Sequence, residues 1–195
     1  MKLSEIIKYC NFNDFEGNPE GVLVNSIEYD SRKVTKNSLF AAIKGFKTDG
    51  HLFIEAAVNN GASAVVIEET DEKIDECLRK NNIVKIKVEN SRKSMAVITD
   101  LFYGYPSKKL KLIGVTGTKG KTSTTFFLKK MFETAGFKCG LIGTIENYIG
   151  DKKIKTMLTT PQSNEINQLM KMMLDEGCEY CVMEVSSVAV DLFRI

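Results

Sequence analysis

Short apolar runs and longer amphipathic stretches alternate along the first half of the chain. The runs are predicted to be strands and the stretches helices: strands at 38–44, 62–67 and 83–88, and helices at 52–60 and 71–80. Ile54, Ala57 and Val58 fall on one face of the first helix, and Gly61 is suited to end it. This alternation predicts a small α/β unit that ends near Val88.

The same alternation continues to the end of the chain. The expected elements are helices at 92–103, 122–135 and 163–176, strands at 110–115, 139–143 and 180–185, and a hairpin within 145–156. Phe127, Met131 and Phe132 are predicted to form the apolar side of the second helix, and Ser163 to cap the third. The fold class is therefore α/β, with domains at 1–88 and 89–195, a mainly parallel sheet in the second domain, and a second unit that the chain leaves incomplete.

Composition narrows the class of protein. The formal net charge of +2 and the absence of a dense basic run disfavour nucleic-acid binding. No segment has the length of a signal peptide or a membrane span, so a cytoplasmic protein without a membrane partner is expected. Cys178 and Cys181 form a CxxC pair, but a zinc site needs further ligands, and the only histidine, His51, is distant in sequence. These cysteines are expected to be small buried residues at the start of a strand.

A glycine-rich segment between a predicted strand and a predicted helix has the context of a P-loop. Gly117 and Gly120 allow backbone angles that turn successive N–H groups inward, and the helix that follows adds the positive end of its dipole. Lys121 would reach ATP phosphate oxygens, and the Thr122 hydroxyl would coordinate Mg²⁺. The predicted ATP-binding residues are Gly117, Thr118, Lys119, Gly120, Lys121, Thr122 and Ser123. The spacing is tighter than in the common P-loop, which has a glycine where this chain has Val115.

Five motifs in order along the chain resemble the Mur ligase family, and among its members the MurE type. They are Asp30-Ser-Arg32 with Leu39-Phe-Ala41, Gly45-Phe-Lys-Thr-Asp-Gly-His51, Gly114-Val-Thr-Gly-Thr-Lys-Gly-Lys-Thr122, Leu158-Thr-Thr-Pro161 and Met183-Glu-Val-Ser-Ser187. The resemblance implies an N-terminal domain that binds a UDP-muramoyl substrate and a central P-loop domain that binds ATP and Mg²⁺. The amino-acid-binding C-terminal domain of the family would lie beyond Ile195.

The resemblance also implies site residues. The UDP-muramoyl substrate would contact eight of them: Ser31, Phe46, Lys47, Thr48, Thr159, Thr160, Ser186 and Arg194. Lys121 and Glu184 would be catalytic, and Thr122 and Glu184 would hold the metal. Glu184 is also expected from the pattern itself to end a strand parallel to the P-loop strand, at the edge where such sheets bind ligands. The chain departs from the MurE pattern at Val188, where histidine is usual, and at Leu192, where glutamine is frequent.

The implied activity is ATP-driven amide formation in peptidoglycan precursor synthesis. A carboxylate of UDP-N-acetylmuramoyl-L-alanyl-D-glutamate would form an acyl phosphate, and the amine of a diaminopimelate- or lysine-type amino acid would then attack it. The expected state is a monomeric fragment that is inactive alone. The alternatives are a sister ligase of the D-alanyl-D-alanine-adding or folylpolyglutamate type, a binding module that holds nucleotide or UDP-sugar without catalysis, and a regulatory P-loop NTPase.

Overall fold

The computed structural model describes residues 1–46, 48–156 and 158–195, so the predicted site residue Lys47 lies outside the described residues. The chain forms two compact units, Met1–Ile98 and Thr99–Ile195. The sequence predicted a boundary near Val88, whereas the two units divide between Ile98 and Thr99, within the helix α4 (Ser91–Phe102). Among the described residues, no helix is long and apolar enough to cross a bilayer.

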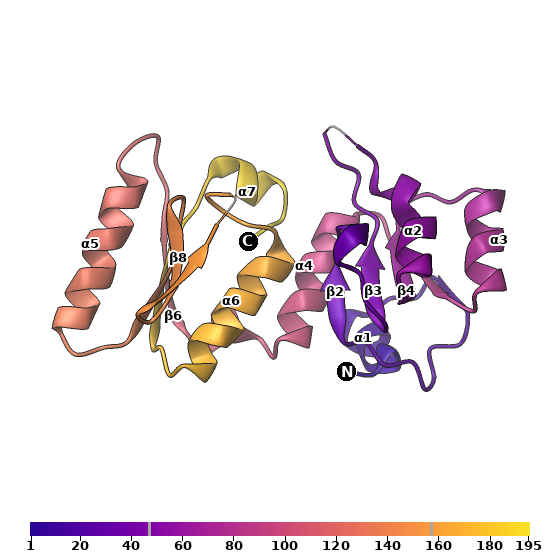
Figure 1. Cartoon of the computed structure of the whole chain (residues 1–195), viewed down its shortest axis with the longest axis horizontal. Coiled ribbons are helices and arrows are strands. Elements are labelled where there is room, and N and C mark those ends of the chain that lie inside the picture. The colour runs from indigo at the N-terminus through magenta and orange to yellow at the C-terminus, as the bar shows by residue number, and fades with distance from the viewer. Residues whose placement is uncertain (47, 157) are drawn as a thin grey trace. The chain divides into compact units, whose positions relative to one another are not determined.

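Unit 1 is a five-stranded sheet with helices on its faces (Figure 1). Its strands lie in the order β1-β5-β4-β3-β2; β2 to β5 are parallel, and β1 is antiparallel to β5. In chain order the elements are α1 (Leu3–Cys10), β1 (Phe15–Glu16), β2 (Ser26–Glu28), η1 (Ser31–Lys33), β3 (Ser38–Ala41), η2 (Gly50–Phe53), α2 (Ile54–Asn59), β4 (Ala62–Ile67), α3 (Glu72–Lys80), β5 (Val84–Lys87) and α4 (Ser91–Phe102). The predicted strands and helices of this unit are confirmed, with shifts of a few residues at their ends.

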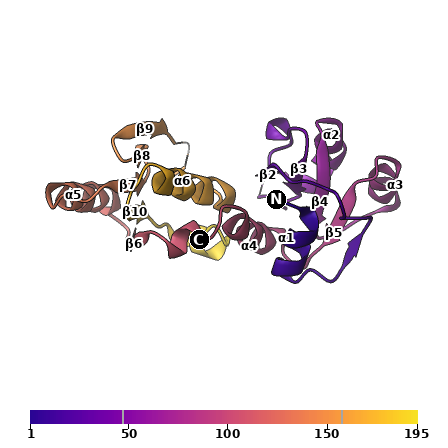
Figure 2. The ribbon, with the colours of Figure 1, turned by 90° about the horizontal axis from the view of Figure 1, so that it is seen from below.

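The core of unit 1 follows from the alternation of side chains along its strands. Phe40 and Val65 are fully buried in one cluster with Ile54 and Ala57 of α2 and Leu78 of α3. The helical face predicted from the sequence is therefore the one that packs. Figure 2 shows α2 and α3 on one side of the sheet and α1 on the other.

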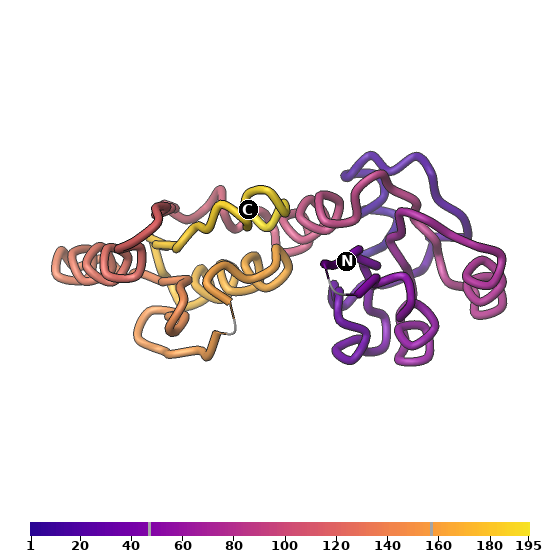
Figure 3. The backbone as a smooth tube through the Cα atoms, turned by 90° about the horizontal axis from the view of Figure 1, so that it is seen from above, coloured from indigo at the N-terminus to yellow at the C-terminus, as the bar shows by residue number. Residues whose placement is uncertain are grey.

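Unit 2 is a five-stranded mixed sheet in the order β6-β10-β7-β8-β9. Its elements are η3 (Pro106–Lys108), β6 (Lys111–Val115), α5 (Lys121–Thr134), β7 (Cys139–Ile142), β8 (Glu146–Ile149), β9 (Lys152–Lys155), α6 (Ser163–Asp175), β10 (Tyr180–Glu184) and α7 (Ser187–Asp191). The strands β6, β10 and β7 are parallel, and the predicted hairpin is the antiparallel pair β8 and β9, drawn in orange in Figure 3.

The helices α5 and α6 cover opposite faces of this sheet (Figures 1 and 2). This follows from right-handed crossovers that run in opposite directions, from β6 to β7 and from β7 back to β10. The carboxyl ends of β6, β10 and β7 consequently lie side by side at one edge of the sheet. The segments that follow these strands are brought together there.

Two sequence-based predictions about the helices of unit 2 were wrong. Phe127 and Met131 of α5 are 70% and 66% exposed, because the helix packs through the buried Thr125 and Lys129 instead. Ser163 does not cap α6: Gln162 occupies the N-cap without a side-chain hydrogen bond, and Ser163 is the first helical residue. The short helix α7, capped by Ser186, was not foreseen.

Candidate functional site

The loop between β6 and α5 has the conformation that its glycines predict. Gly117 and Gly120 have φ angles of 149° and 80°, which residues with a side chain rarely adopt. Gly120 is the N-cap of α5, so the unpaired N–H groups of the first turn open toward the loop. The Lys121 ammonium reaches back over the loop and donates to the Gly117 carbonyl at 2.7 Å. The inward-turned N–H groups, the helix N-terminus and the lysine ammonium that the sequence predicted thus lie together.

Glu184 ends β10 directly beside the P-loop strand, since it pairs in register with Val115. Its carboxylate is 1% exposed and accepts three hydrogen bonds. Oε2 accepts from the hydroxyls of Thr122 and Thr144, both at 3.0 Å, and Oε1 accepts from the Thr144 N–H at 2.9 Å. The two residues predicted to bind a metal, Thr122 and Glu184, therefore touch each other.

The donor atoms of this pair suit magnesium. A hydroxyl and a carboxylate are hard oxygen ligands, and Mg²⁺ is commonly held by one or two protein oxygens together with phosphates and water. No group of three or more acidic, histidine or cysteine side chains that could hold a metal occurs in the described part of the chain. Two protein oxygens leave the other coordination positions of Mg²⁺ to phosphates and water, so the pair fits a cation that arrives with a nucleotide.

A second set of predicted residues surrounds the end of β10. The buried Thr160 hydroxyl donates to the Glu184 carbonyl at 2.9 Å and accepts from the Ser186 N–H at 3.2 Å. Arg194 donates from Nη1 to the Thr160 carbonyl at 3.0 Å, while its Nε is buried without a partner among the described residues. Thr159 contacts Thr144 through their hydroxyls at 3.1 Å. The structure thus brings Thr159, Thr160 and Arg194 next to Glu184, as a shared site requires.

Thr144 is the residue of this cluster that the sequence analysis missed. It follows the neighbouring parallel strand β7 by two residues, and its place at the carboxyl edge was the available signal. The turn that carries it is fixed: the buried Gly143 N–H donates to the Asn147 side chain at 3.1 Å. A Cβ on Gly143 would lie 2.7 Å from Glu184 Oε1. The packing of this turn therefore depends on glycine.

In unit 1, the predicted substrate residues follow the adjacent parallel strands β2 and β3. Ser31 is buried at the start of η1, where its carbonyl accepts from the Asn60 side chain at 2.9 Å. Asp30 caps this turn, and a hydrogen bond from Arg32 holds the pKa of its carboxyl below the usual value. Phe46 is 85% exposed and Thr48 is exposed. Among the described residues, no hydrogen bond joins Ser31 to Phe46 or Thr48. A shared pocket for the UDP end is therefore not visible in these segments.

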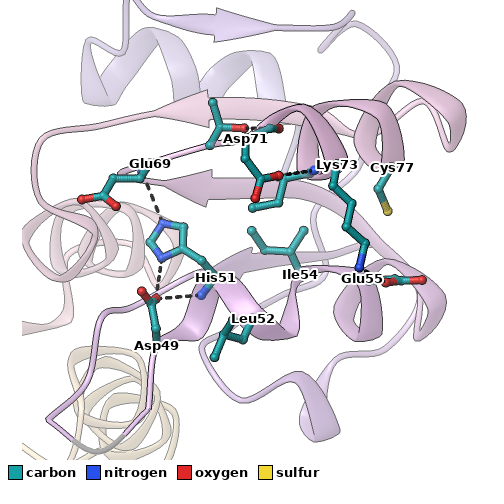
Figure 4. A pocket seen from close by; sticks show the side chains of 11 residues that line it. Asp49, His51, Leu52, Ile54, Glu55, Glu69, Asp71, Lys73 and Cys77 are labelled. Carbon is teal, nitrogen blue, oxygen red and sulfur yellow. Dashed lines mark hydrogen bonds and ion pairs between the residues drawn. The ribbon is translucent and has the colours of Figure 1, made fainter.

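His51 is held by hydrogen bonds at both of its ring nitrogens. Figure 4 shows it in a cavity of about 390 Å³ lined by η2, α2 and α3. Its Nδ1 lies 2.6 Å from Asp49 Oδ1, and its Nε2 accepts the Glu68 N–H at 3.1 Å (Glu69 N–H lies at 3.4 Å). Nδ1 holds the ring to Asp49 of the same β3–α2 connection, and Nε2 joins this connection to the segment that follows β4.

The CxxC pair is part of the core. Cys178 and Cys181 are 4% and 0% exposed and belong to the cluster between α6 and the sheet. Burial raises the pKa of both thiols, which keeps them protonated and poor as metal ligands or nucleophiles. The prediction of small buried residues at the start of β10 is confirmed.

Unit 2 is a P-loop α/β domain: a glycine loop joins a parallel strand to a helix, and an acid ends the neighbouring strand. Comparison with known proteins agrees with this class. The family model "Mur ligase middle domain" matches residues 115–195, and "Mur ligase family, catalytic domain" matches residues 23–103. The chain belongs to the Mur ligase family, of which it contains N-terminal and middle domains.

The relatives are named ligases. The chain is 52% identical over 195 residues to UDP-N-acetylmuramoyl-L-alanyl-D-glutamate--2,6-diaminopimelate ligase of Clostridium tetani and 45% identical to that of Clostridium perfringens. In both cases all of the chain is matched, but it spans only 39% of the relative's length.

Solved structures share the fold. A structure titled as the same kind of ligase matches the whole chain with a TM-score of 0.75 at 22% identity, over 37% of its own length. A MurF ligase from Thermotoga maritima in complex with ADP matches 86% of the chain and 33% of its own length, with a TM-score of 0.55 at 24% identity.

Proposed function

We propose that this chain forms the UDP-muramoyl-binding and ATP-binding parts of a MurE-type ligase, which joins an amino acid to UDP-N-acetylmuramoyl-L-alanyl-D-glutamate. The observation that carries the proposal is the hydrogen bond between Thr122 of the P-loop helix and the buried Glu184. This contact supports the proposal because a hydroxyl and a carboxylate that could both bind Mg²⁺ lie together beside the loop that would bind phosphate. The relatives named above add 2,6-diaminopimelate, and we propose the same amino acid here.

Each residue has a task in this reaction. The N–H groups of the loop and the Lys121 ammonium bind and orient the ATP phosphates, and they stabilise the charge that develops on the transferred phosphoryl group. Thr122 and Glu184 would hold Mg²⁺, which neutralises phosphate charge. Because Lys121 already spans the loop to Gly117, it needs only to exchange a carbonyl for phosphate oxygens.

The substrate side lies across Glu184 from the P-loop. Thr159, Thr160, Ser186 and Arg194 would orient the muramoyl peptide so that its carboxylate faces the ATP γ-phosphate. The partnerless buried Nε of Arg194 supports this role, because a buried guanidinium donor without an acceptor is costly unless a ligand supplies one. Holding both reactants in one geometry supplies much of the rate gain in such reactions. In unit 1, Ser31, Phe46, Lys47 and Thr48 would bind the UDP end.

Binding measurements test the proposal. Calorimetry should show that the chain binds the ATP analogue AMP-PNP with Mg²⁺ and, separately, UDP-N-acetylmuramoyl-L-alanyl-D-glutamate. Lys121→Ala should weaken AMP-PNP binding about 10- to 100-fold, as expected for the loss of a hydrogen bond to a charged group. Lys130→Ala removes the same charge from an exposed position of the same helix and should change the affinity less than twofold. Equal affinities for the two variants would refute the site.

Two competing functions predict different results. A regulatory P-loop NTPase would hydrolyse ATP without the muramoyl dipeptide and would not bind it. A nucleotide- or UDP-sugar-binding module would bind one of these ligands but not the other. The contact between the Thr159 and Thr144 hydroxyls favours the ligase, because it joins the predicted substrate segment to the predicted metal carboxylate.

A further inference from the structure

Thr144 connects two parts of the site that no sequence motif joins. Its N–H and hydroxyl bind the two oxygens of Glu184 at 2.9 and 3.0 Å, and the same hydroxyl lies 3.1 Å from the Thr159 hydroxyl. Glu184 belongs to the metal side of the proposed site and Thr159 to the substrate side. Thr144 itself comes from a third segment, the turn after β7.

The Thr144 hydroxyl serves both contacts. A hydroxyl has one proton to donate and can accept through its lone pairs, whereas an ionised carboxylate only accepts. The Thr144 hydroxyl is in position to donate to Glu184 Oε2 at 3.0 Å and to the Thr159 hydroxyl at 3.1 Å, so these two acceptors share its one proton. One hydroxyl therefore links Glu184 to Thr159, and the Thr159 hydroxyl, as an acceptor in this contact, keeps its own proton to donate to a ligand.

Glu184 depends on this contact for its orientation. Its carboxylate is buried, and its bonding partners are Thr122 on one side and Thr144 on the other. Among the described ion pairs none involves Glu184, so these neutral donors fix the carboxylate. Partners that orient a metal ligand without touching the metal typically change metal affinity 10- to 100-fold when removed.

We propose that Thr144 is a positioning residue that sets the Glu184 carboxylate for Mg²⁺ and the Thr159 hydroxyl for the muramoyl substrate at the same time. The inference rests on the proposed function and extends it to a residue outside the recognised motifs. Its role is distinct from that of Lys121, which contacts the nucleotide directly.

The test compares Thr144→Val with Thr144→Ser. Valine keeps the shape and the backbone N–H but removes the hydroxyl, whereas serine restores the hydroxyl. Thr134→Val is the matched control, because Thr134 is exposed at the far end of α5 and bonds only to the Lys130 carbonyl among the described contacts. The first readout is AMP-PNP affinity as a function of MgCl₂ concentration, with EDTA as the metal-free reference. The second is affinity for UDP-N-acetylmuramoyl-L-alanyl-D-glutamate.

Thr144→Val should raise the MgCl₂ concentration for half-maximal effect about 10-fold and weaken muramoyl-dipeptide binding about 2- to 10-fold. Its AMP-PNP affinity in EDTA should equal that of the wild type, because the P-loop is untouched. Thr144→Ser should return both values to within about twofold, and Thr134→Val should change neither.

Three results would overturn the proposal. Unchanged Mg²⁺ dependence in Thr144→Val would show that Glu184 is positioned without Thr144. Equal losses with and without Mg²⁺ would show a general structural defect. If the wild-type chain binds neither AMP-PNP nor the muramoyl dipeptide, both the proposed function and this inference are refuted. If the wild type binds both ligands and Thr144→Val behaves like it, the inference alone is refuted.

Discussion

Gly143→Ala perturbs the proposed metal site without changing any group that would touch a ligand. The added Cβ would lie 2.7 Å from Glu184 Oε1 and 3.0 Å from Leu141 Cδ2. Both separations are shorter than ordinary contacts, and the Glu184 carboxylate is held by its hydrogen bonds to Thr122 and Thr144. The carboxylate must therefore move, and the Thr144 N–H bond to Oε1 is the first that it loses.

The size of the effect follows from these contacts. Overpacking in a well-ordered interior costs about 1–3 kcal/mol. For a unit of roughly 100 residues, 1 kcal/mol corresponds to about 4–8 °C in Tm, so thermal unfolding of unit 2 should occur at least about 4 °C lower. Displacing the carboxylate should also raise the MgCl₂ requirement of AMP-PNP binding about 10- to 100-fold.

Gly140→Ala separates the two effects. Gly140 lies within β7, three residues before Gly143, but its Cβ would meet the flexible side chain of Met173, with a nearest distance of 2.3 Å to Sδ. This variant should lower Tm while leaving the Mg²⁺ dependence of nucleotide binding unchanged. If both alanine variants alter the Mg²⁺ dependence equally, or if Gly143→Ala alters neither property, the close packing of Gly143 on Glu184 does not control the site.

Two further predictions concern groups outside the site. Iodoacetamide at pH 7 should label the half-buried Cys77 but should not label Cys139 or Cys181 until the protein is denatured, because both are buried and burial raises the pKa of Cys139 to about 11. Labelling is measured by peptide mass spectrometry, and equal labelling of the three cysteines in the folded protein would contradict this prediction. Lys85→Met should destabilise unit 1 at pH 7 by about 1–3 kcal/mol in urea unfolding, since it breaks a 2.7 Å bond to Asp75. The hydrogen bond from Lys85 lowers the pKa of Asp75 from its ordinary value of 3.8, so the pair stabilises the fold fully above pH 3.8 and loses this effect as the pH falls through the lower pKa of the folded state. The variant should therefore lose less stability on acidification than the wild type. Parallel profiles of stability against pH for the two proteins would contradict this role of the pair.

The hydrophobic pattern predicted the elements well where a strand is a continuous apolar run or a helix buries one stripe. The strand 62–67 was predicted correctly because it is a short apolar run buried on both faces, with only Ser63 partly exposed, and the face of α2 because one helical stripe packs in the core. The position of Glu184 was also predictable, because the end of a parallel strand beside the P-loop strand is fixed by topology alone.

The error at α5 has a physical cause. Apolar side chains occur around much of this helix, so composition does not reveal which stripe packs. The structure buries Thr125 and Lys129, and Phe132 stacks on Tyr180 with ring centroids 4.1 Å apart. Burial of Lys129 is possible because its ammonium pairs with Glu133 and lies 5.0 Å from the Tyr148 ring centroid. Partners from distant segments thus decided the orientation.

Thr144 was missed for a different reason, which also shows how it could be found. A lone threonine after a strand carries no motif, and only the strand order β6-β10-β7 reveals that its strand is the other neighbour of β10. When a parallel strand ends in an acidic residue, the residues near the ends of its two neighbouring strands are candidate partners of that acid. Val115 at the end of β6 and Gly143 just after β7 flank Glu184, but the valine side chain has no hydrogen-bond donor and glycine has no side chain. The donors therefore come from the next positions that reach back toward the carboxylate, Thr122 on the P-loop side and Thr144 on the other.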